Sequence, residues 1–284
     1  MSGARPAGAE FHLTGEGLER ICDYLYRRTG MTFGEKKRYY IERRVADRMK
    51  AVGTESFTVY FGVLRADPDE GEALINAFTV NETYFYREEH QFRCLTESLL
   101  PELIRSRAPG DRIRVWSNPC SSGEEPYSIA LWLLEHWRLV DAYNVEIHGS
   151  DIDSRALAEA AEGQYGERAL SRLPPDVLSE YFEPAKHRRR KIIDDLRESI
   201  VLSPANLIEA DSMRPHGQFD VIFCRNVLIY FDEASRQAAA ANLFQALAPG
   251  GFLCLGHTES MSRISDAFVL RRFRDAIVYQ RPAV

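Results

Sequence analysis

Acidic residues stand directly after two predicted strands of this sequence, where they could bind a small ligand. Glu124 and Glu125 follow the turn at residues 118–123 and open a helix, and Asp151 ends a second apolar stretch. Strand, tight polar turn and helix form the first unit of a doubly wound α/β domain, whose turn holds a ligand against backbone N–H groups. The turn has one glycine, unlike a dinucleotide fingerprint, and its carboxylates would repel a pyrophosphate. The expected ligand is a nucleoside with an amine or another positive group.

Further polar residues are spaced along the chain in a way that suits such a nucleoside. An acid at the end of the second strand suits two ribose hydroxyls, although either Asp151 or Asp153 could be only the cap of the next helix. Arg87, with the amide of Asn81, is a good donor for a carboxylate. One acid for an amine, one for a ribose, donors for a carboxylate and amides for adenine together suit S-adenosylmethionine. The other members of this constellation are Glu124 or Glu125, Asn206, Asn226 and Tyr230.

Other kinds of active site find less support. His257 near Glu259 could form an acid–base pair, but a lone histidine after a strand is more often structural. No Ser–His–Asp arrangement is recognisable, and Cys120 and Cys224 have no evident base to activate them. The spacing of a metal site is also absent, so no metal is expected.

Composition indicates an ordinary globular chain of the reducing cytoplasm. Of 284 residues, 45% are hydrophobic and 27% charged, and no apolar run approaches the ~20 residues of a membrane span. Residues 1–10 lack an apolar stretch, so neither a secretory signal nor membrane insertion is expected. The 5 cysteines include no CxxC pair, which is typical of reduced thiols. A net charge of −6 argues against nucleic acid as a partner.

The first part of the chain is predicted to be a small all-helical domain, because no strand pattern precedes residue 80. Lys37, Arg44 and Arg48 fall together along one edge of the apolar stripe of its second helix. That edge is either a solvated basic face or a docking surface for an acidic partner. The expected helices span residues 11–26, 35–49, 57–64 and 72–78.

The rest of the chain alternates strands and helices, which predicts a parallel sheet covered by helices. Residues 219–226 have the composition of a buried parallel strand. A basic stretch at 183–191 predicts short strands and turns inserted in the α/β order. The remaining expected strands are 112–116, 145–149, 252–256 and a closing antiparallel pair, 269–273 and 276–280. The expected helices are 88–103, 124–137, 154–162, 174–181 and 233–247.

Taken together, several motifs resemble those of the CheR-type chemoreceptor glutamate methyltransferases, in the order of that family. The motifs are residues 81–87, 121–128, 150–153, 206–207, 219–232 and 256–260. The resemblance implies an all-helical receptor-docking domain at 1–85. It also implies a Rossmann-like class I methyltransferase domain at 86–284, with a small antiparallel β insert at about 181–203.

The same resemblance assigns expected roles to single residues. Arg87, with Asn81 and Thr83, holds the methionine end of S-adenosylmethionine, and Tyr230 stands beside the transferred methyl. Arg87 and Tyr230 are therefore the catalytic candidates. The other expected cofactor contacts are Glu124 or Glu125 to the amine, Asp151 to the ribose, and Asn206, Leu207, Asn226 and Val227 to the adenine side.

The implied reaction methylates receptor glutamates to carboxyl esters and releases S-adenosylhomocysteine. The expected partner is the cytoplasmic domain of a methyl-accepting chemoreceptor, with Lys37, Arg44 and Arg48 on its acidic helices. Members of the family that grip a receptor's C-terminal tail carry an arginine just after the pair Tyr181–Phe182 and a longer insert. Both are missing here, so methylation by an untethered monomer is predicted.

Two alternative functions remain open from the sequence. One is a methyltransferase for a different acceptor, although the motif of amino-methylating enzymes is absent after the fourth strand, where Arg225-Asn226-Val227 stands. The other is a non-catalytic adaptor that docks on receptors and binds S-adenosylmethionine or S-adenosylhomocysteine. The sequence identifies neither the receptor nor its methylated glutamates.

Overall fold

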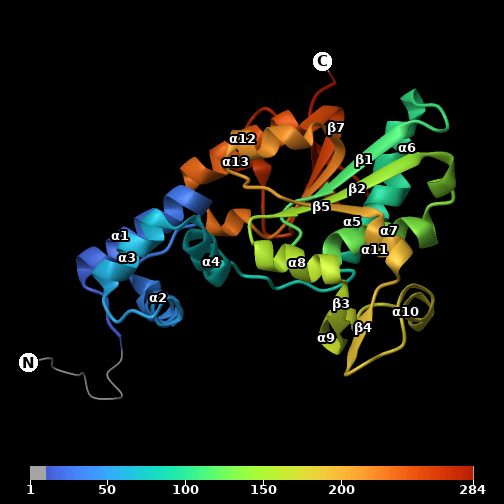
Figure 1. Ribbon diagram of the computed structural model, residues 1–284. Helices are drawn as coiled ribbons and strands as arrows, with labels where there is room; N and C mark the ends of the chain where they lie inside the picture. Colours follow the sequence, from blue (N-terminus) through green and yellow to red (C-terminus); the bar gives the residue numbers. More distant parts are fainter. Residues whose placement is uncertain (1–10, 284) are drawn as a thin grey trace, which may run out of the picture. The chain divides into compact units, whose positions relative to one another are not determined.

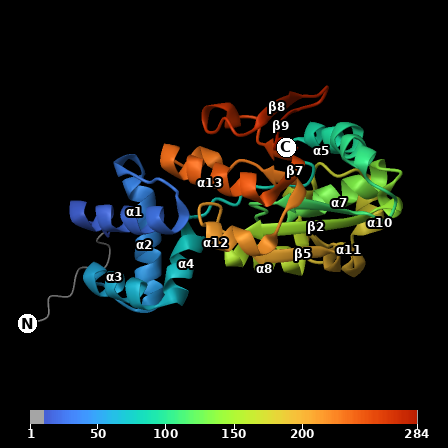
Figure 2. The ribbon, with the colours of Figure 1, turned by 90° about the horizontal axis from the view of Figure 1, so that it is seen from above.

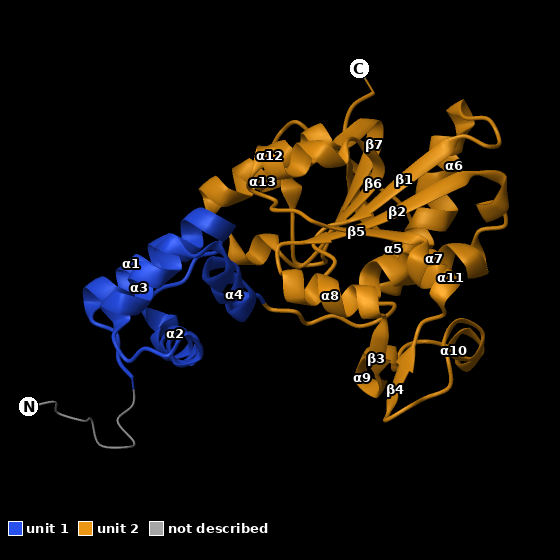
Figure 3. Cartoon of the chain, in the orientation of Figure 1, with its two compact units in different colours: residues 1–79 blue, residues 80–284 orange. Residues whose placement is uncertain are grey.

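The chain divides into two compact units, Met1–Thr79 and Val80–Val284 (Figure 3). The structure, a computed structural model, describes residues 11–283. Residues 1–10, for which no secretory signal is predicted, lie outside the described part. The division falls before the boundary predicted at residue 85, so the polar and aromatic stretch 81–87 belongs to the second unit.

The first unit is all-helical, as predicted. The hydroxyl of Thr14 accepts the N–H of Gly17 and begins the first helix, which ends at Gly30 in the left-handed conformation, with a φ of 72°. Apolar side chains such as Ile21 and Val45 are fully buried between the helices. The helices are α1 (Gly15–Thr29), α2 (Arg38–Val52), α3 (Phe57–Ala66) and α4 (Pro68–Phe78), with a short 3-10 turn (Glu35–Lys37) before α2.

The second unit is built on a 7-stranded sheet in the order β5-β2-β1-β6-β7-β9-β8 (Figure 1). The strands from β5 to β7 pair in parallel, whereas β9 is antiparallel to β7 and to β8. The predicted Rossmann-like order and the closing antiparallel pair are therefore confirmed. The strands are β1 (Arg112–Ser117), β2 (Asn144–Asp151), β5 (Ile200–Pro204), β6 (Phe219–Cys224), β7 (Leu247–Leu255), β8 (Val269–Arg272) and β9 (Ile277–Gln280).

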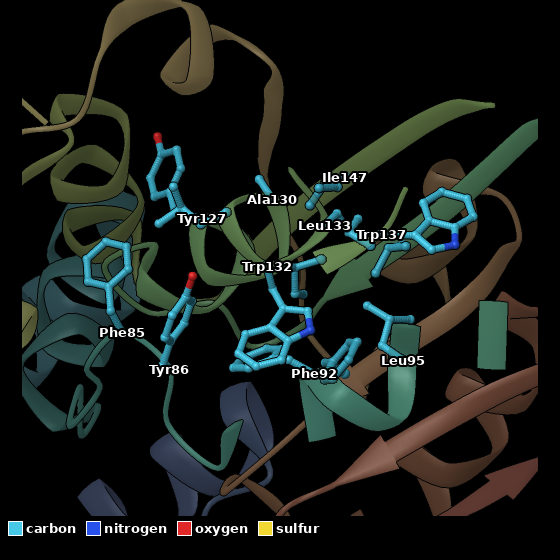
Figure 4. Close-up of a cluster of buried hydrophobic side chains, with 14 of the residues drawn as sticks. Phe85, Tyr86, Phe92, Leu95, Tyr127, Ala130, Trp132, Leu133, Trp137 and Ile147 are labelled. Atoms are coloured by element: carbon cyan, nitrogen blue, oxygen red, sulfur yellow. The ribbon is translucent and has the colours of Figure 1, made fainter. Parts of the chain in front are cut away.

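Both faces of the sheet are covered, because neighbouring residues of the central strands are buried alike. Val115 and Trp116 of β1 are both inaccessible to solvent although their side chains point to opposite faces. On one face, Phe92, Leu95 and Trp132 pack together between the helices and the strands (Figure 4). Such continuous burial is what a parallel sheet between two layers of helices requires.

The predicted helices of the second unit are present in order, and the short helices α9, α11 and α12, which are given below, were not predicted. The expected helix 88–103 is interrupted by a π-helical turn at Leu95–Leu99. Among residues 11–283, no helix combines the length and the apolar character that a bilayer crossing demands. The helices are α5 (Glu89–Cys94), α6 (Leu100–Leu103), α7 (Glu124–His136), α8 (Ser154–Glu162), α9 (Glu167–Leu170), α10 (Pro175–Tyr181), α11 (Asp194–Glu198), α12 (Ala210–Met213) and α13 (Glu233–Ala246).

The small antiparallel sheet pairs β3 (Gln164–Gly166) with β4 (Arg189–Lys191). Its first strand lies earlier in the chain than the insert expected at 181–203. The last residues of that expected insert instead form β5, which lies beside β2 at the end of the main sheet (Figure 2). A strand of three residues, such as β3, is too short to show an alternating pattern in the sequence.

Candidate active site

The loops that follow the parallel strands meet at one edge of the sheet, where such folds bind ligands. The turn after β1 is held there by its backbone: the N–H of Asn118 donates to Phe223 O (2.9 Å), and that of Cys120 donates to Ser150 O (2.7 Å). Gly123 closes the turn with a φ of 94°, and a Cβ at this position would lie 2.8 Å from the Cβ of Ala160. Glycine is therefore required where the turn enters α7.

Of Asp151 and Asp153, either of which could be the cap of α8 from the sequence alone, only Asp153 caps that helix. Asp153 is the cap of α8, since its Oδ1 accepts the N–H of Arg155 (3.0 Å) and of Ala156 (3.1 Å). Asp151 Oδ2 accepts the N–H of Ser121 (2.8 Å), and its Oδ1 accepts the N–H of Asp153 (2.9 Å). Asp151 is thus the acid that faces the turn after β1.

Burial makes Asp151 electrostatically unusual. Asp151 is only 4% exposed, and this desolvation raises the pKa of its carboxyl to about 6. The hydrogen bonds from the N–H groups of Asp153 and Ser121 act in the opposite direction and lower the pKa. The carboxylate is therefore ionised at pH 7 but carries a desolvation cost. A ligand with hydroxyl donors would reduce that cost by hydrogen bonding to the ionised form.

Glu124 and Glu125 differ in what they face. Glu124 Oε2 accepts the hydroxyl of Ser122 (2.8 Å), and burial raises the pKa of its carboxyl. Glu125 accepts the hydroxyl of Ser117 (2.8 Å) and a guanidinium N–H of Arg225 (2.7 Å). Only Glu125 of this pair lines the pocket described below.

Arg225 is a functional candidate that sequence reasoning did not single out. Its side chain is 2% exposed and lies between two acids, with Nη1 at 2.7 Å from Glu125 Oε2 and Nη2 at 3.2 Å from Glu88 Oε2. Nη2 also donates to Arg87 O (2.7 Å), whereas the buried Nε has no hydrogen-bond acceptor within the described residues. The sequence could have indicated Arg225 because it directly follows the most buried strand, where a charge is tolerated only when it is paired.

The stretch 81–87 is fastened across the carboxyl edge of the sheet. Asn81 Nδ2 donates to Asp153 Oδ2 (2.7 Å), and the N–H of Tyr86 donates to the hydroxyl of Ser128 on α7 (3.0 Å). Directly after Tyr86, Arg87 is half-buried and donates to Glu82 O (2.5 Å). Asn81 therefore holds the cap residue of α8. Within residues 11–283, no carboxylate lies within hydrogen-bond distance of the Arg87 guanidinium.

Glu259 fastens the loop after β6 and forms no pair with His257. Its Oε2 accepts the N–H of Asn226 (2.7 Å), and its Oε1 accepts that of Leu228 (2.8 Å). Burial raises the pKa of the Glu259 carboxyl, and these N–H groups oppose the shift. His257 Nδ1 instead lies 2.7 Å from Glu88 Oε1. The acid–base pair considered from the sequence is therefore not formed.

The remaining predicted residues sit on the loops after β5 and β6. Asn206 Oδ1 accepts the N–H of Ile208 (3.3 Å), and the neighbouring Ala205 donates its N–H to Asp151 O (3.1 Å). Asn226 adopts a φ of 60°, and Tyr230 ends a short 3-10 turn (Leu228–Tyr230) in a half-buried position.

One pocket brings together predicted residues from four separate motifs. Thr83, Arg87, Glu125, Asp151 and Asn226 all contribute to its lining, with Arg225 beside them. Asn81, Glu124, Asn206, Leu207, Val227 and Tyr230 are not part of that lining. The pocket thus combines the half-buried cation of Arg87, the buried acid Asp151 and the pair of Glu125 with the buried Arg225. Such a set suits a ligand with a carboxylate, hydroxyls and an amine.

The three basic residues predicted for docking differ in how much charge they present. Arg48 forms a two-bond ion pair with the buried Glu70 (3.1 and 2.5 Å), and Tyr60 also donates to Glu70 (2.8 Å). Arg44 donates to the carbonyl of Ala77 (2.5 Å) and lies over the ring of Tyr40. Lys37 is exposed. Arg48 therefore stabilises the helical unit itself, whatever else it does.

No group of three or more His, Cys, Asp or Glu residues within 11–283 has an arrangement that could hold a metal ion.

Comparison with known proteins identifies both units. Residues 81–277 match the family described as CheR methyltransferase, SAM binding domain, and residues 16–79 match CheR methyltransferase, all-alpha domain. The chain is 45% identical to Chemotaxis protein methyltransferase 2 of Vibrio cholerae, over 96% of this chain and 95% of that protein. It is 37% identical to the Chemotaxis protein methyltransferase of Klebsiella aerogenes, over 89% and 86%. It is 34% identical to Chemotaxis protein methyltransferase 2 of Pseudomonas aeruginosa, over 90% of each.

Proposed function

Because this chain belongs to the CheR methyltransferase family, we propose that it forms methyl esters on glutamate side chains of methyl-accepting chemoreceptors. The chain is a methyltransferase, and S-adenosylmethionine is its cofactor. The observation that carries the proposal is the convergence of Arg87, Glu125 and Asp151 on one pocket from three distant stretches of sequence. These are the groups that a methionine end and a ribose require.

One observation independent of the family supports an anionic ligand group at this pocket. The buried Nε of Arg225 lacks an acceptor within the described residues, although Arg225 lines the pocket. An unsatisfied buried N–H costs about 1–3 kcal/mol, so a ligand carboxylate or an ordered water is expected to meet it. Arg87 would share the carboxylate, Asp151 would accept the ribose hydroxyls, and Glu125 would face the amine while staying paired with Arg225.

The proposed reaction requires little proton transfer by the protein. The cofactor supplies a methyl group on a positively charged sulfur. A receptor glutamate is already ionised at pH 7, so no strong base is needed to make it nucleophilic. What remains is to hold the acceptor oxygen in line with the methyl group and to limit water around the two opposite charges. In this proposal Tyr230 orients the acceptor, and Arg87 and Asp151 keep the cofactor in place.

The first unit is proposed to dock on the receptor, in the cytoplasm and without a tail tether. Lys37, in the 3-10 turn before α2, is the exposed member of the predicted basic edge. Arg44 and Arg48 lie on α2 and bind groups of the unit itself. An acidic receptor helix would therefore meet Lys37 directly. A monomer suffices for this arrangement, since every group proposed for cofactor and acceptor lies in one chain.

Replacement of Tyr230 by phenylalanine is expected to lower turnover about fivefold while leaving S-adenosylhomocysteine affinity unchanged. The reason is that an orienting hydroxyl contributes one neutral hydrogen bond, worth about 1 kcal/mol. Methylation kinetics and isothermal titration of the same preparation would measure the two effects. A loss of cofactor affinity equal to the loss of turnover would contradict the proposed place of Tyr230 beside the acceptor.

The proposal is tested by incubating the protein with radiolabelled S-adenosylmethionine and membranes that carry a chemoreceptor. Label that base treatment releases as a volatile product indicates a carboxyl ester. Receptors whose candidate glutamates are replaced by glutamine provide the matched control and should lose the label. Base-stable label would indicate methylation of another kind of acceptor. Tight binding of S-adenosylhomocysteine without any transferred label would contradict methylation and support the alternative of a non-catalytic adaptor.

A further inference from the structure

A second pocket of the methyltransferase unit, with a volume of ≈ 630 Å³, lies between the turn after β6, the start of α13 and residues 258–264. Its size is within the range of ligand sites. Leu228 and Ile229, which precede Tyr230, contribute to its lining, and Ile229 is 48% exposed. None of the proposed cofactor contacts lines this pocket.

Glu259 connects this pocket to the cofactor pocket. Its Oε2 accepts the N–H of Asn226, which lines the cofactor pocket, and its Oε1 accepts that of Leu228, which lines the second pocket. The two pockets therefore share one loop. A ligand in the second pocket would lie beside the residue that is proposed to orient the acceptor.

Two arginines give the second pocket its chemical character. Arg236 on α13 is half-buried, and its Nε donates to Leu228 O (2.9 Å), so its guanidinium is held against the pocket wall. Arg263 is exposed and forms no ion pair or hydrogen bond with the residues that the structure describes. Of the two acids in the lining, Glu259 is turned to backbone N–H groups, and the exposed Glu233 stands at the first turn of α13.

We propose that this pocket binds a second carboxylate of the acceptor, carried by the same acidic helix as the glutamate that is methylated. The inference rests on the proposed function and adds a specificity-determining residue, Arg263, which would recognise an acid near the methylated glutamate. It follows from charge: the chain has a net charge of −6, which repels an acidic segment at long range. A local pair of arginines beside the reacting turn offsets that repulsion and favours acceptors with a neighbouring acid. The exposed Ile229 offers an apolar contact to the helix that bears both.

The test measures methylation of a chemoreceptor cytoplasmic fragment that keeps one methylated glutamate. In the receptor, each acid within two helical turns of that glutamate is replaced singly by its amide. Arg263→Gln is expected to lower kcat/KM about three- to tenfold through KM, because an exposed charged hydrogen bond is worth up to about 1 kcal/mol and the increased long-range repulsion adds to the loss. The loss in kcat/KM caused by Arg263→Gln should vanish on the one receptor fragment in which the acid that contacts Arg263 has been replaced by its amide. Arg263→Glu with a lysine at that receptor position should restore activity.

Arg138→Gln is the matched control, because Arg138 is an exposed arginine after α7 that does not line the pocket. It should leave KM unchanged, and both variants should bind S-adenosylhomocysteine like the unaltered protein. Equal losses on every fragment, or unchanged KM in both Arg263 variants, would overturn the inference while leaving methylation itself intact. Absence of methyl transfer by the unaltered protein would instead overturn the proposed function, and this inference with it.

Discussion

Replacing Asp151 with asparagine is expected to weaken S-adenosylhomocysteine binding about a hundredfold at neutral pH. The ionised carboxylate is proposed to accept two ribose hydroxyls, and hydrogen bonds to a charged group contribute about 1.5–3 kcal/mol each. Folding should be little affected, because asparagine removes a buried charge and can still accept one of the two N–H groups now bound by Asp151. Isothermal titration measures the affinity. Asp141→Asn, at an exposed position in the same unit, is the control for handling of the variants.

The pH dependence of binding provides a second measure of the same residue. Burial raises the pKa of Asp151 to about 6, so the carboxyl takes up a proton as the pH falls through that value. Only the ionised form accepts both hydroxyls, and affinity should therefore fall by up to about tenfold per pH unit below the pKa. The Asp151→Asn variant should show no such dependence. A similar pH profile in both proteins would mean that another group is responsible.

Replacing Arg225 with methionine is expected to destabilise the second unit by about 3–5 kcal/mol, since it leaves Glu125, whose side chain is only 12% exposed, without its cation. Urea denaturation followed by tryptophan fluorescence reports on this unit alone, because Trp116, Trp132 and Trp137 all lie within it. The deficit should be smaller at low pH. Without Arg225 the folded-state pKa of Glu125 rises further, so the variant regains stability as protonation proceeds.

The double variant Arg225→Met/Glu125→Gln distinguishes an uncompensated charge from a lost contact. If the charge is the cause, the added substitution should recover a large part of the lost stability. Glu88, the second acid at Arg225, is part of the same cluster; burial raises its pKa, but Arg225 and His257 outweigh that effect and lower it. A deficit below about 1 kcal/mol in the single variant, or no recovery in the double variant, would contradict this account.

Long elements with a strong apolar pattern could be predicted from the sequence. The buried strand at residues 219–226 and the helix at 233–247 are examples, and the structure has both within a few residues. The strand β3 could not be predicted, because its three residues form a strand only through pairing with β4, which follows later in the chain. Periodicity reports on local burial and carries no information on such a partner.

The candidate site shows the same limit. Residues at strand ends could be placed at the pocket because parallel strands present their carboxyl ends together. Which of Asp151 and Asp153 caps α8 depends on N–H directions that spacing does not reveal. The ion pair of Arg225 with Glu125 joins positions 100 residues apart, and that of Arg48 with Glu70 joins two helices. Such pairings follow from tertiary packing, so a basic edge on a helical wheel could not be separated into exposed and occupied charges.

The way Glu259 holds the loop after β6 has a consequence for how the family can vary. The carboxylate grips backbone N–H groups, including that of Leu228, and every amino acid except proline offers the same donor. The side chain at the exposed position 229 can therefore change while the path of the loop stays the same. The constraint falls on Glu259 and on Gly256, where a Cβ would lie 2.7 Å from Asn226 Nδ2. Selection can thus reshape the surface proposed to meet the acceptor without disturbing the position of Tyr230.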